Sequence, residues 1–291
     1  MTSEFTHLVE TIEQHHSFLL LSHVDPDGDA IGSLIALLLL LERKGKRAVA
    51  YEQDGVPEIY RFLRCSDRIV SAIPPSEHFD VAMFLECPDV QRAGSESAPF
   101  IAKIPLWVNI DHHMENSRFG HLNIIESELS AVGEVIFDLF RAMGEPIDMT
   151  VAEALYTAIM TDTGSYKYTN TTPRAHEISA QLIKAGVNPY DMYQEIYENV
   201  SASAAMIAAR AHSTLEVDDG VSCITITRAM LEQTGATAED THDIVNFGRG
   251  IKDVEVALLF RETDNGIKVS LRSRNYVNVS KIAVRFGGGG H

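Results

Sequence analysis

The stretch from 22 to 33, Ser-His-Val-Asp-Pro-Asp-Gly-Asp-Ala-Ile-Gly-Ser, constrains the fold more than any other part of this chain. A short apolar run, 18–21, precedes it and is typical of a buried strand, whereas the longer apolar segment 31–41 that follows has the length of a helix. Pro26 and Gly28 favour a turn between them. The sequence therefore places one histidine and three aspartates between a strand and the start of a helix.

Three carboxylates this close together repel one another, and a bound cation is the obvious reason to keep them together. Asp27 or Asp29 could instead cap the helix, but a cap needs only one such residue. An EF-hand loop does not fit, because Gly28 comes at the fourth loop position rather than the sixth, and Ala36 stands where a glutamate is required. We therefore expect this turn to bind metal.

Strand-like and helix-like segments alternate through the first part of the chain. Strands are expected at 17–22, 47–52, 79–86 and 106–110, and helices at 4–16, 29–44, 57–64, 130–143, 150–161 and 174–185. This alternation predicts an α/β domain with a parallel sheet and helices on both faces. Ligands of such sheets gather at the carboxyl ends of the strands. Three of the apolar runs end there on acids or histidines, which are His23, Glu86 and Asp111-His112-His113.

Six of these side chains form the candidate metal site: His23, Asp27, Asp29, Glu86, His112 and Asp162. Histidine and carboxylate ligands without cysteine suit Mn²⁺, Fe²⁺, Mg²⁺ or Zn²⁺. Six ligands are about right for two metals that share bridging carboxylates and clamp a phosphoryl group. His113 could protonate a leaving oxygen or bind the phosphate, and we group it with Asp111 as catalytic. Each residue alone has an ordinary structural interpretation, so the prediction rests on their order and spacing together.

The rest of the chain predicts a linker and a second domain. Residues 187–217 are helical and alanine-rich, which is typical of a linker helix pair. The predicted second domain has strands at 221–227, 254–262 and 267–273 and helices at 239–249 and 279–285, followed by a glycine run that could be a flexible tail. Arg272 and Arg274 alternate and should share one strand face, which by default is solvated. The expected domains are 1–186 and 218–291, with the linker between them.

Composition restricts the partners and the compartment. The formal net charge of −17 is a poor match for a protein that coats long nucleic acid, but it permits a short phosphorylated substrate if bound cations supply positive charge. The three cysteines have no paired spacing, which argues against a disulfide scaffold. The N-terminus is unlike a signal peptide, and no apolar run is long enough for a membrane span. We therefore expect a cytoplasmic protein that does not associate with membranes.

The motifs HVDPDGDAIGS, LECPD, DHH, TDTGSY and SLRS…GGGGH together resemble the DHH phosphoesterase family, in its two-domain branch of short-oligoribonucleotide hydrolases and pAp phosphatases. The resemblance implies Mn²⁺ as the usual metal, with Mg²⁺ as an alternative, and Asp162 as a bridging ligand. It implies hydrolysis of short 5′-phosphorylated RNA and of pAp, and it is compatible with a homodimer. It also implies a smaller α/β DHH-associated domain that binds substrate through Arg272, Arg274, Gly288, Gly289, Gly290 and His291.

Two departures from the family pattern leave alternatives open. The second motif usually offers aspartate, whereas this chain has Glu86, and Asp89 is the competing ligand. The sequence stops at His291, where family members usually continue, so we expect the C-terminal domain to be either truncated or partly disordered at its end. The metal core alone does not separate RNA and pAp from cyclic or linear dinucleotides, polyphosphate or pyrophosphate. A non-catalytic nucleotide-binding relative is the alternative of another class.

Overall fold

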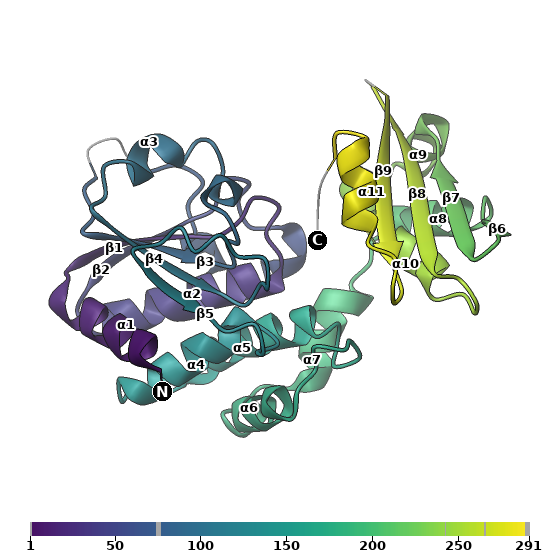
Figure 1. Cartoon of the computed structure of the whole chain (residues 1–291). Coiled ribbons are helices and arrows are strands. Elements are labelled where there is room, and N and C mark those ends of the chain that lie inside the picture. Colours follow the sequence, from purple (N-terminus) through teal and green to yellow (C-terminus); the bar gives the residue numbers. More distant parts are fainter. Residues whose placement is uncertain (1, 74–76, 242, 265, 289–291) are drawn as a thin grey trace. The chain divides into compact units, whose positions relative to one another are not determined.

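The structure is a computed structural model that describes residues 2–73, 77–241, 243–264 and 266–288. The chain forms two compact units, unit 1 (Met1–Asn199) and unit 2 (Val200–His291), each with its own sheet (Figure 1). Their boundary falls inside the segment 187–217 that the sequence predicts as a linker. The helix α7 (Pro189–Tyr193) and the π-helical turn η4 (Gln194–Glu198) belong to unit 1, whereas α8 (Ala202–His212) belongs to unit 2.

Unit 1 is built on a parallel five-stranded sheet, as the alternation of strands and helices predicts. The strand order is β2-β1-β3-β4-β5, and all four pairs are parallel. The strands are β1 (Ser17–Leu21), β2 (Arg47–Tyr51), β3 (Val81–Leu85), β4 (Leu106–Asp111) and β5 (Leu122–Ile125). The edge strand β5 is an addition to the four expected strands.

The order of the strands creates a switch point between β1 and β3. From β1 the chain first adds β2 on one side and then β3 on the other, and doubly wound sheets bind ligands where the order reverses in this way. Leu85 lies opposite Ile110, so Glu86, which follows β3, and Asp111, the last residue of β4, lie at the same level. The residues that follow β1, β3 and β4 therefore meet at one edge of the sheet.

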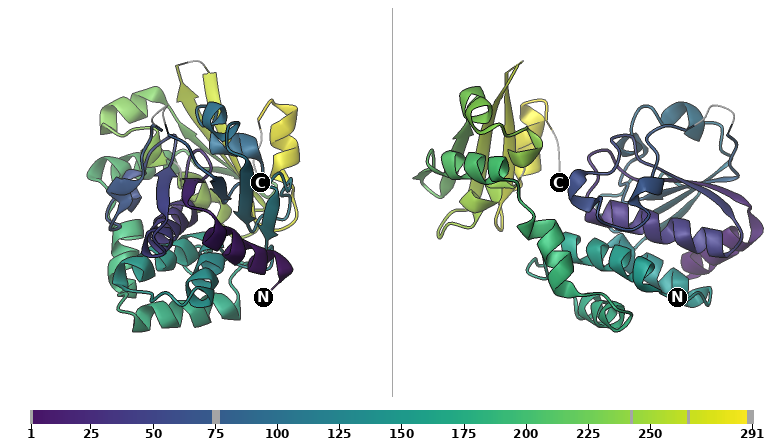
Figure 2. Two further views of the ribbon diagram at one scale, coloured as in Figure 1. Left: turned by 90° about the vertical axis from the view of Figure 1, so that its left-hand side faces the viewer. Right: turned by 180° about the vertical axis from the view of Figure 1, so that it is seen from behind.

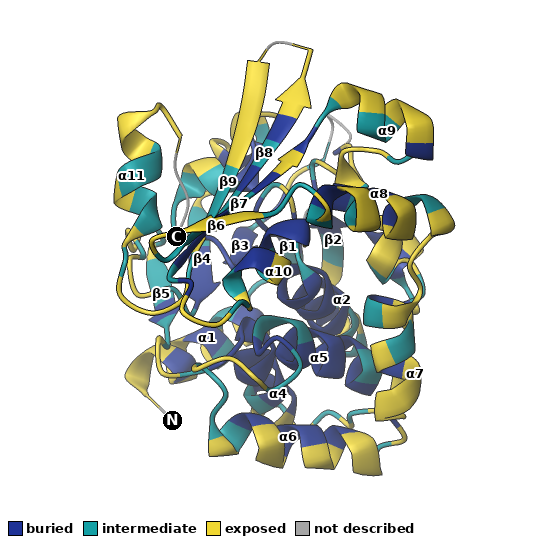
Figure 3. Cartoon of the chain, turned by 90° about the vertical axis from the view of Figure 1, so that its right-hand side faces the viewer, coloured by how far each residue is buried: buried dark blue, intermediate teal, exposed yellow. Residues whose placement is uncertain are grey.

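Alternate residues of the strands enter two different cores. Phe18 and Leu20 face the larger core with the helices α1 (Ser3–Gln14), α2 (Gly28–Arg43), α4 (Val132–Ala142), α5 (Met149–Asp162) and α6 (Pro173–Lys184). Leu19 and Leu21 face a smaller core that includes Ile101 of the short helix α3 (Ala98–Ile101). Figure 3 colours α2, β1, β3 and β4 almost wholly buried. Burial on both faces explains why β1 and β3 are almost continuous apolar runs and why β4 is apolar apart from Asn109 and Asp111.

The helices α2 and α5 pack closely because α2 presents two glycines to α5. A Cβ atom on Gly32 would lie 2.2 Å from the carbonyl oxygen of Ala154, and one on Gly28 would lie 2.4 Å from Oγ1 of Thr161. Both contacts are shorter than any side chain tolerates. This close approach brings the first turn of α2, with Asp29, next to the end of α5, with Asp162.

Unit 2 has a mixed four-stranded sheet in the order β6-β7-β8-β9. Its strands are β6 (Glu216–Asp218), β7 (Val221–Ile226), β8 (Val256–Thr263) and β9 (Gly266–Ser273), and only the β7–β8 pair is parallel. Its core joins β7 and β8 to α8, α9 (Arg228–Thr234) and α10 (Ile244–Arg249), and Figure 2 shows α8 in green across this sheet. The helix α11 (Val279–Arg285) follows β9.

Two expected helices are shorter than predicted. The helix predicted at 239–249 is wrong in extent, because the structure has a 3₁₀ turn, η5 (Glu239–Thr241), and then α10. The helix predicted at 57–64 is only the 3₁₀ turn η1 (Glu58–Tyr60), and further 3₁₀ turns are η2 (Ser66–Arg68) and η3 (Val90–Ala93). None of the described helices combines the length and the apolar character that crossing a membrane requires.

Candidate active site

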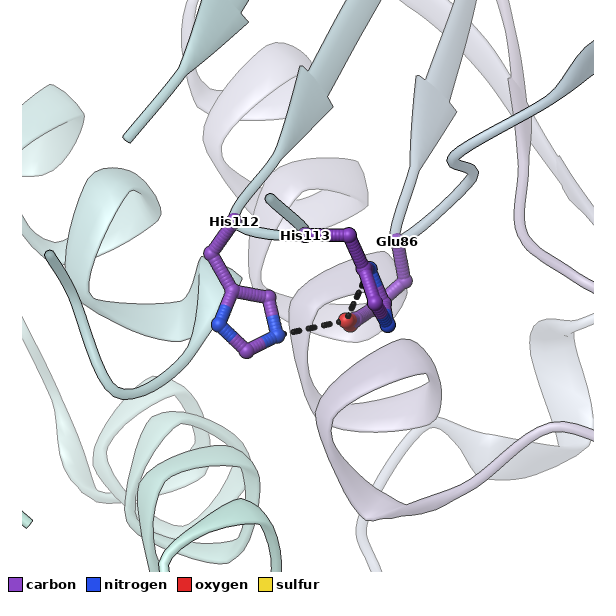
Figure 4. Close-up of side chains that lie close together, drawn as sticks. All are labelled: Glu86, His112 and His113. Atoms are coloured by element: carbon purple, nitrogen blue, oxygen red, sulfur yellow. Dashed lines mark hydrogen bonds and ion pairs between the residues drawn. The ribbon is translucent and has the colours of Figure 1, made fainter. Parts of the chain in front are cut away.

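Glu86, His112 and His113 converge at the carboxyl ends of β3 and β4. Figure 4 shows the Glu86 carboxylate between the two imidazole rings. Its Oε1 lies 2.8 Å from Nε2 of His112 and 3.5 Å from Nδ1 of His113. The backbone of Glu86 is left-handed (φ 60°), a conformation that non-glycine residues keep mainly at constrained functional sites. The structure thus places Glu86 in the cluster, whereas the competing candidate, Asp89, caps the η3 turn through its carboxylate.

His112 faces acceptors on both ring nitrogens. Nδ1 lies 3.2 Å from the carbonyl oxygen of Leu129, and Nε2 lies 3.6 Å from Oδ2 of Asp162 in addition to the Glu86 contact. Burial disfavours the charged ring, but the hydrogen bond and charge of Glu86 and the charge of Asp162 outweigh burial and raise the pKa of His112 to about 11. His112 is therefore protonated, and its positive charge partly balances the negative charges of the surrounding acids.

The buried carboxylates at this edge of the sheet have too little positive charge beside them to balance their own negative charges. Burial and the negative charges of Asp29 and Asp27 together raise the pKa of Asp162 to about 8. Burial also raises the pKa of Glu86 well above its usual range, again with help from Asp29. The pKa of Asp29 is raised by burial and by Asp27, against the charge of His112. The side chains predicted as ligands from four separate motifs therefore sense one another's charge.

These residues fit a divalent metal. The second carboxylate oxygen of Glu86, Oε2, is buried and has no hydrogen-bond partner among the described residues, which is costly unless another ligand completes it. Raised carboxylate pKa values return toward normal when a cation binds beside them. A hydrogen bond from Nδ1 of His112 to a backbone carbonyl leaves Nε2 as the ligand atom, which is the usual arrangement of metal-binding histidines.

Asp29 also holds α4 in place. Its Oδ2 accepts a hydrogen bond from the backbone N–H of Val132 at 2.6 Å, and its Oδ1 accepts from Gly133 at 2.9 Å and from Ser33 Oγ at 2.9 Å. The helix α4 has no side-chain cap at its own N-cap residue, Ala131, so Asp29 caps it from another helix. This bond network fixes the carboxylate of Asp29 at the start of two helices.

His23 and Asp27 lie on the turn between β1 and α2. Asp27 is the N-cap of α2 and accepts from the N–H of Ala30 through Oδ1 at 3.0 Å. The capping interpretation is therefore correct for Asp27, and its Oδ2 is not used by the cap. His23 is buried, and its Nδ1 lies 2.9 Å from the carbonyl oxygen of Val24. As with His112, this contact directs Nε2 toward a ligand.

Asp111 orients His113. Its Oδ1 lies 2.7 Å from Nδ1 of His113, and its Oδ2 accepts from Nδ2 of Asn116 at 2.5 Å. Burial would raise the pKa of Asp111, but the hydrogen bonds and the charge of His113 outweigh burial and lower it. Asp111 is therefore an ionised carboxylate that holds the ring of His113, an arrangement found where histidine transfers protons.

Unit 2 has a pocket of about 350 Å³ at the end of β9. Arg272 lies in β9 and Arg274 directly after it, and both line the pocket. The other lining residues are Arg249, Leu271, Ser273, Asn275, Val277, Asn278, Val279 and Ser280. Three arginines and several amide or hydroxyl groups around one hollow suit an anion.

Glu255 holds the loop that forms this pocket. Its Oε1 accepts hydrogen bonds from the backbone N–H groups of Asn275, Tyr276 and Val277 and from Oγ of Ser273, at 2.7–3.1 Å. Although burial acts in the opposite direction, these bonds lower the pKa of Glu255 to about 2. The carboxylate thus stays charged and fixes the path of the loop.

The glycine run is only partly within the described residues. The N–H of Gly288 donates to the carbonyl oxygen of Ala283 at 2.9 Å and so closes α11. Gly289, Gly290 and His291, which the sequence assigns to the substrate site, lie outside the described residues.

Five residues at these sites are not found by the sequence reasoning: Arg92, Asn116, Asn170, Arg249 and Glu255. Asn170 donates to Oδ2 of Asp162 at 3.2 Å, and Asn116 donates to Asp111. The asparagines follow the DHH and TDTGSY motifs by a few residues, so their proximity to the motifs is a usable signal. Glu255 gives no such signal, because its partners are about twenty residues away in the chain.

A parallel sheet with histidines and acids at its switch point is the architecture of a metal-dependent hydrolase domain, and the comparison with known families agrees. Residues 17–159 match the DHH family, N-terminal domain, and residues 221–291 match the DHHA1 domain. The chain belongs to the DHH family of phosphoesterases, which are metal-dependent enzymes.

Relatives of known name narrow the branch of the family. The chain is 32% identical to the bifunctional oligoribonuclease and PAP phosphatase of Thermus thermophilus, over 93% of this chain and 80% of that protein. It is 26% identical to the protein of the same name from Bacillus subtilis, over 98% of this chain and 90% of that one. A crystal structure of an exopolyphosphatase-related protein from Bacteroides fragilis matches with a TM-score of 0.94 and 27% identity, covering 100% of this chain and 91% of that chain.

Proposed function

We propose that this protein hydrolyses short 5′-phosphorylated oligoribonucleotides to mononucleotides and pAp to AMP. The observation that carries the proposal is the convergence of Glu86, His112 and His113 with Asp29 and Asp162 at the switch point of unit 1. The names of the relatives from Thermus thermophilus and Bacillus subtilis support the choice of substrates.

The proposed metal ligands are the six residues that the sequence predicts: His23, Asp27, Asp29, Glu86, His112 and Asp162. We expect them to hold two divalent ions, Mn²⁺ in the first place and Mg²⁺ as the alternative, because the donor set is nitrogen and oxygen only. Divalent ions bound there supply Lewis-acid catalysis for phosphoryl transfer. The raised pKa values of Glu86 and Asp162 support this assignment, since both carboxylates gain from a nearby cation.

His113 is the proposed general acid. In hydrolysis a water molecule loses one proton as its oxygen forms a bond to phosphorus, the bond from phosphorus to the leaving oxygen breaks, and that oxygen takes up one proton. Asp111 holds Nδ1 of His113, so Nε2 of this ring is the atom that can deliver the proton. The low pKa of Asp111 supports its role as the anionic partner that keeps His113 oriented.

The arginine pocket of unit 2 is the proposed site for a second phosphate of the substrate. Arg272 and Arg274 can bind phosphate oxygens, and remote binding of this kind helps to orient the scissile bond. Arg272→Ala should therefore raise KM for pAp by roughly tenfold. Arg210→Ala, which removes an exposed arginine of α8 in the same unit, is the matched control and should leave KM unchanged.

A substrate panel at fixed Mn²⁺ tests the proposed function. It contains a 5′-phosphorylated series from dinucleotide to about 24 nucleotides, pAp, pyrophosphate, polyphosphate and a cyclic dinucleotide. We expect the highest kcat/KM for pAp and for RNA of about two to five nucleotides, with a steep decline for longer strands that the negative charge of the protein repels. Preferred cleavage of polyphosphate, pyrophosphate or the cyclic dinucleotide would assign another member of the family. No turnover of any substrate would support a binding protein.

A further inference from the structure

Arg92 lies beside the candidate metal site on an element that no predicted motif includes. It belongs to the η3 turn that follows β3, and its carbonyl oxygen accepts the N–H of Val24 at 2.7 Å. This bond ties the η3 turn to the turn that carries His23. The Nη2 atom of Arg92 lies 3.3 Å from Nδ1 of His23, and its Nε is buried without a hydrogen-bond partner among the described residues.

The contact between Arg92 and His23 does not satisfy both side chains. Nδ1 of His23 also lies 2.9 Å from the carbonyl oxygen of Val24, and one ring nitrogen carries either a proton or a lone pair. With the proton on Nδ1, His23 donates to Val24, and the guanidinium then faces another donor. With the lone pair on Nδ1, His23 accepts from Arg92, but the neutral ring then has its proton on Nε2 and cannot bind metal through that atom.

The form of His23 that binds metal through Nε2 therefore leaves the guanidinium of Arg92 without an acceptor among the described residues. A guanidinium is always charged and offers five donors in one plane, so a half-buried one without an acceptor is costly. No carboxylate oxygen of the described residues lies within ion-pair distance of this arginine. An anion that enters beside His23 would supply the missing acceptor.

We propose that Arg92 binds a non-bridging oxygen of the phosphate group that is hydrolysed in unit 1. The inference rests on the proposed function for the identity of the anion, because a phosphoryl group at the metals would lie next to His23. A guanidinium matches two phosphate oxygens at once, which a point charge does not. This role is separate from that of the arginines in unit 2, which bind another part of the substrate.

The rival interpretation is that Arg92 only positions His23. Under that interpretation its loss would weaken metal binding and leave the affinity of phosphate for the metal-loaded protein unchanged. The two interpretations therefore differ in a quantity that can be measured without turnover.

The test uses inorganic phosphate and protein loaded with Mn²⁺ and freed of excess metal. Paramagnetic broadening of the ³¹P resonance reports phosphate near Mn²⁺, and emission spectrometry gives the Mn²⁺ content of each variant. The titration is repeated in an Arg272→Ala background, so that phosphate bound in the arginine pocket of unit 2 is accounted for. Arg92→Ala should weaken phosphate binding by about 10- to 100-fold at unchanged Mn²⁺ content, and Arg92→Lys should weaken it less. Arg141→Ala, at the exposed end of α4, is the control of equal charge and should match the wild type.

Two results would overturn the inference. One is a phosphate affinity of Arg92→Ala equal to that of the wild type. The other is a loss of Mn²⁺ with unchanged phosphate affinity of the metal-loaded fraction. An unchanged thermal melting curve of Arg92→Ala excludes misfolding as the cause of weaker binding. Failure of the wild type to hydrolyse pAp or dinucleotides would refute the proposed function, yet the phosphate titration would still decide the role of Arg92.

Discussion

The three histidines at the switch point differ in what holds their Nδ1 atoms. In His23 and His112 this nitrogen faces a backbone carbonyl, whereas in His113 it faces the carboxylate of Asp111. A carbonyl fixes the ring without adding charge, which suits a metal ligand, and a carboxylate stabilises the protonated ring, which suits an acid. The groups beside Nδ1 therefore distinguish the roles of His112 and His113, which their adjacent positions in the sequence do not.

This difference predicts the effect of removing His113. His113→Ala should lower kcat for pAp by about 10²- to 10⁴-fold, the usual contribution of a general acid, while the metal content stays near that of the wild type. The exposed His7 of α1 provides the control, because His7→Ala should change neither quantity. Loss of metal from His113→Ala would show instead that His113 is a ligand.

The buried acid Glu52, which is hydrogen-bonded to the residue before His23, predicts a pH dependence of stability. Glu52 follows β2, accepts a hydrogen bond from Oγ of Ser22 at 2.8 Å, and has its pKa raised by burial from 4.5 to about 7. The neutral carboxyl therefore stabilises the folded state. This contribution is complete below pH 4.5 and is lost as the pH rises through about 7.

Glu52→Gln keeps an acceptor for Ser22 and cannot ionise. It should raise the free energy of unfolding at pH 8 by roughly 3 kcal/mol relative to the wild type and have little effect at pH 4.5. Urea unfolding of both proteins across this pH range, with metal removed, measures the difference. A difference that does not change with pH would mean that the carboxyl of Glu52 titrates normally in the folded protein.

Among the helices and strands, those with two buried faces could be predicted from sequence and those at edges could not. The strands β1 and β3 are almost entirely apolar, and β4 is apolar apart from Asn109 and its last residue, Asp111, because helices or loops cover both faces. Their carboxyl ends were correctly expected to meet. Among the described strands, β5 pairs with β4 alone, and its short Leu-Asn-Ile-Ile sequence gives no strand pattern. The helix α9 was missed although Thr227 caps it and Gly235 ends it, so its signals were present in the sequence.

The site could be predicted only where the motifs supply the residue. Parallel strands bring successive carboxyl ends to one edge, so the neighbourhood of Glu86 and His112 follows from the topology. The capping of α4 by Asp29 and the position of Arg92 depend on how separate elements pack, and neither leaves a periodic pattern. Sequence reasoning thus predicts which residues gather and not what each one bonds.

The carboxylate of Glu255 holds the loop after β9, so the loss of this side chain should disturb the arginine pocket. Glu255→Ala removes the acceptor for three backbone N–H groups and should raise KM for pAp by roughly tenfold, because Arg274 and Asn275 lose their positions in the pocket. Glu262→Ala is the control, since this acid of β8 accepts only one described hydrogen bond, from Arg228. Equal KM values for both variants would contradict the role of Glu255. Because the pKa of Glu255 is lowered from 4.5 to about 2, its carboxylate should stay charged and keep this role at every pH above 4.5.

The whole molecule is acidic, with 41 aspartates and glutamates against 24 lysines and arginines. Phosphate therefore has to bind where positive charge is concentrated locally. Unit 1 has buried acids that require cations, and unit 2 has three arginines around one pocket. This distribution favours small phosphorylated substrates over long nucleic acid, which needs an extended basic surface.

The central claim is that the acids and histidines of unit 1 form a centre for two divalent ions. Anomalous X-ray diffraction from crystals grown with Mn²⁺ tests it most directly, because the anomalous peaks locate the ions independently of activity. We predict two peaks within the group formed by His23, Asp27, Asp29, Glu86, His112 and Asp162, and loss of both in Asp162→Ala if that carboxylate bridges the ions. Peaks elsewhere on the protein, or none within this group at saturating Mn²⁺, would contradict the account.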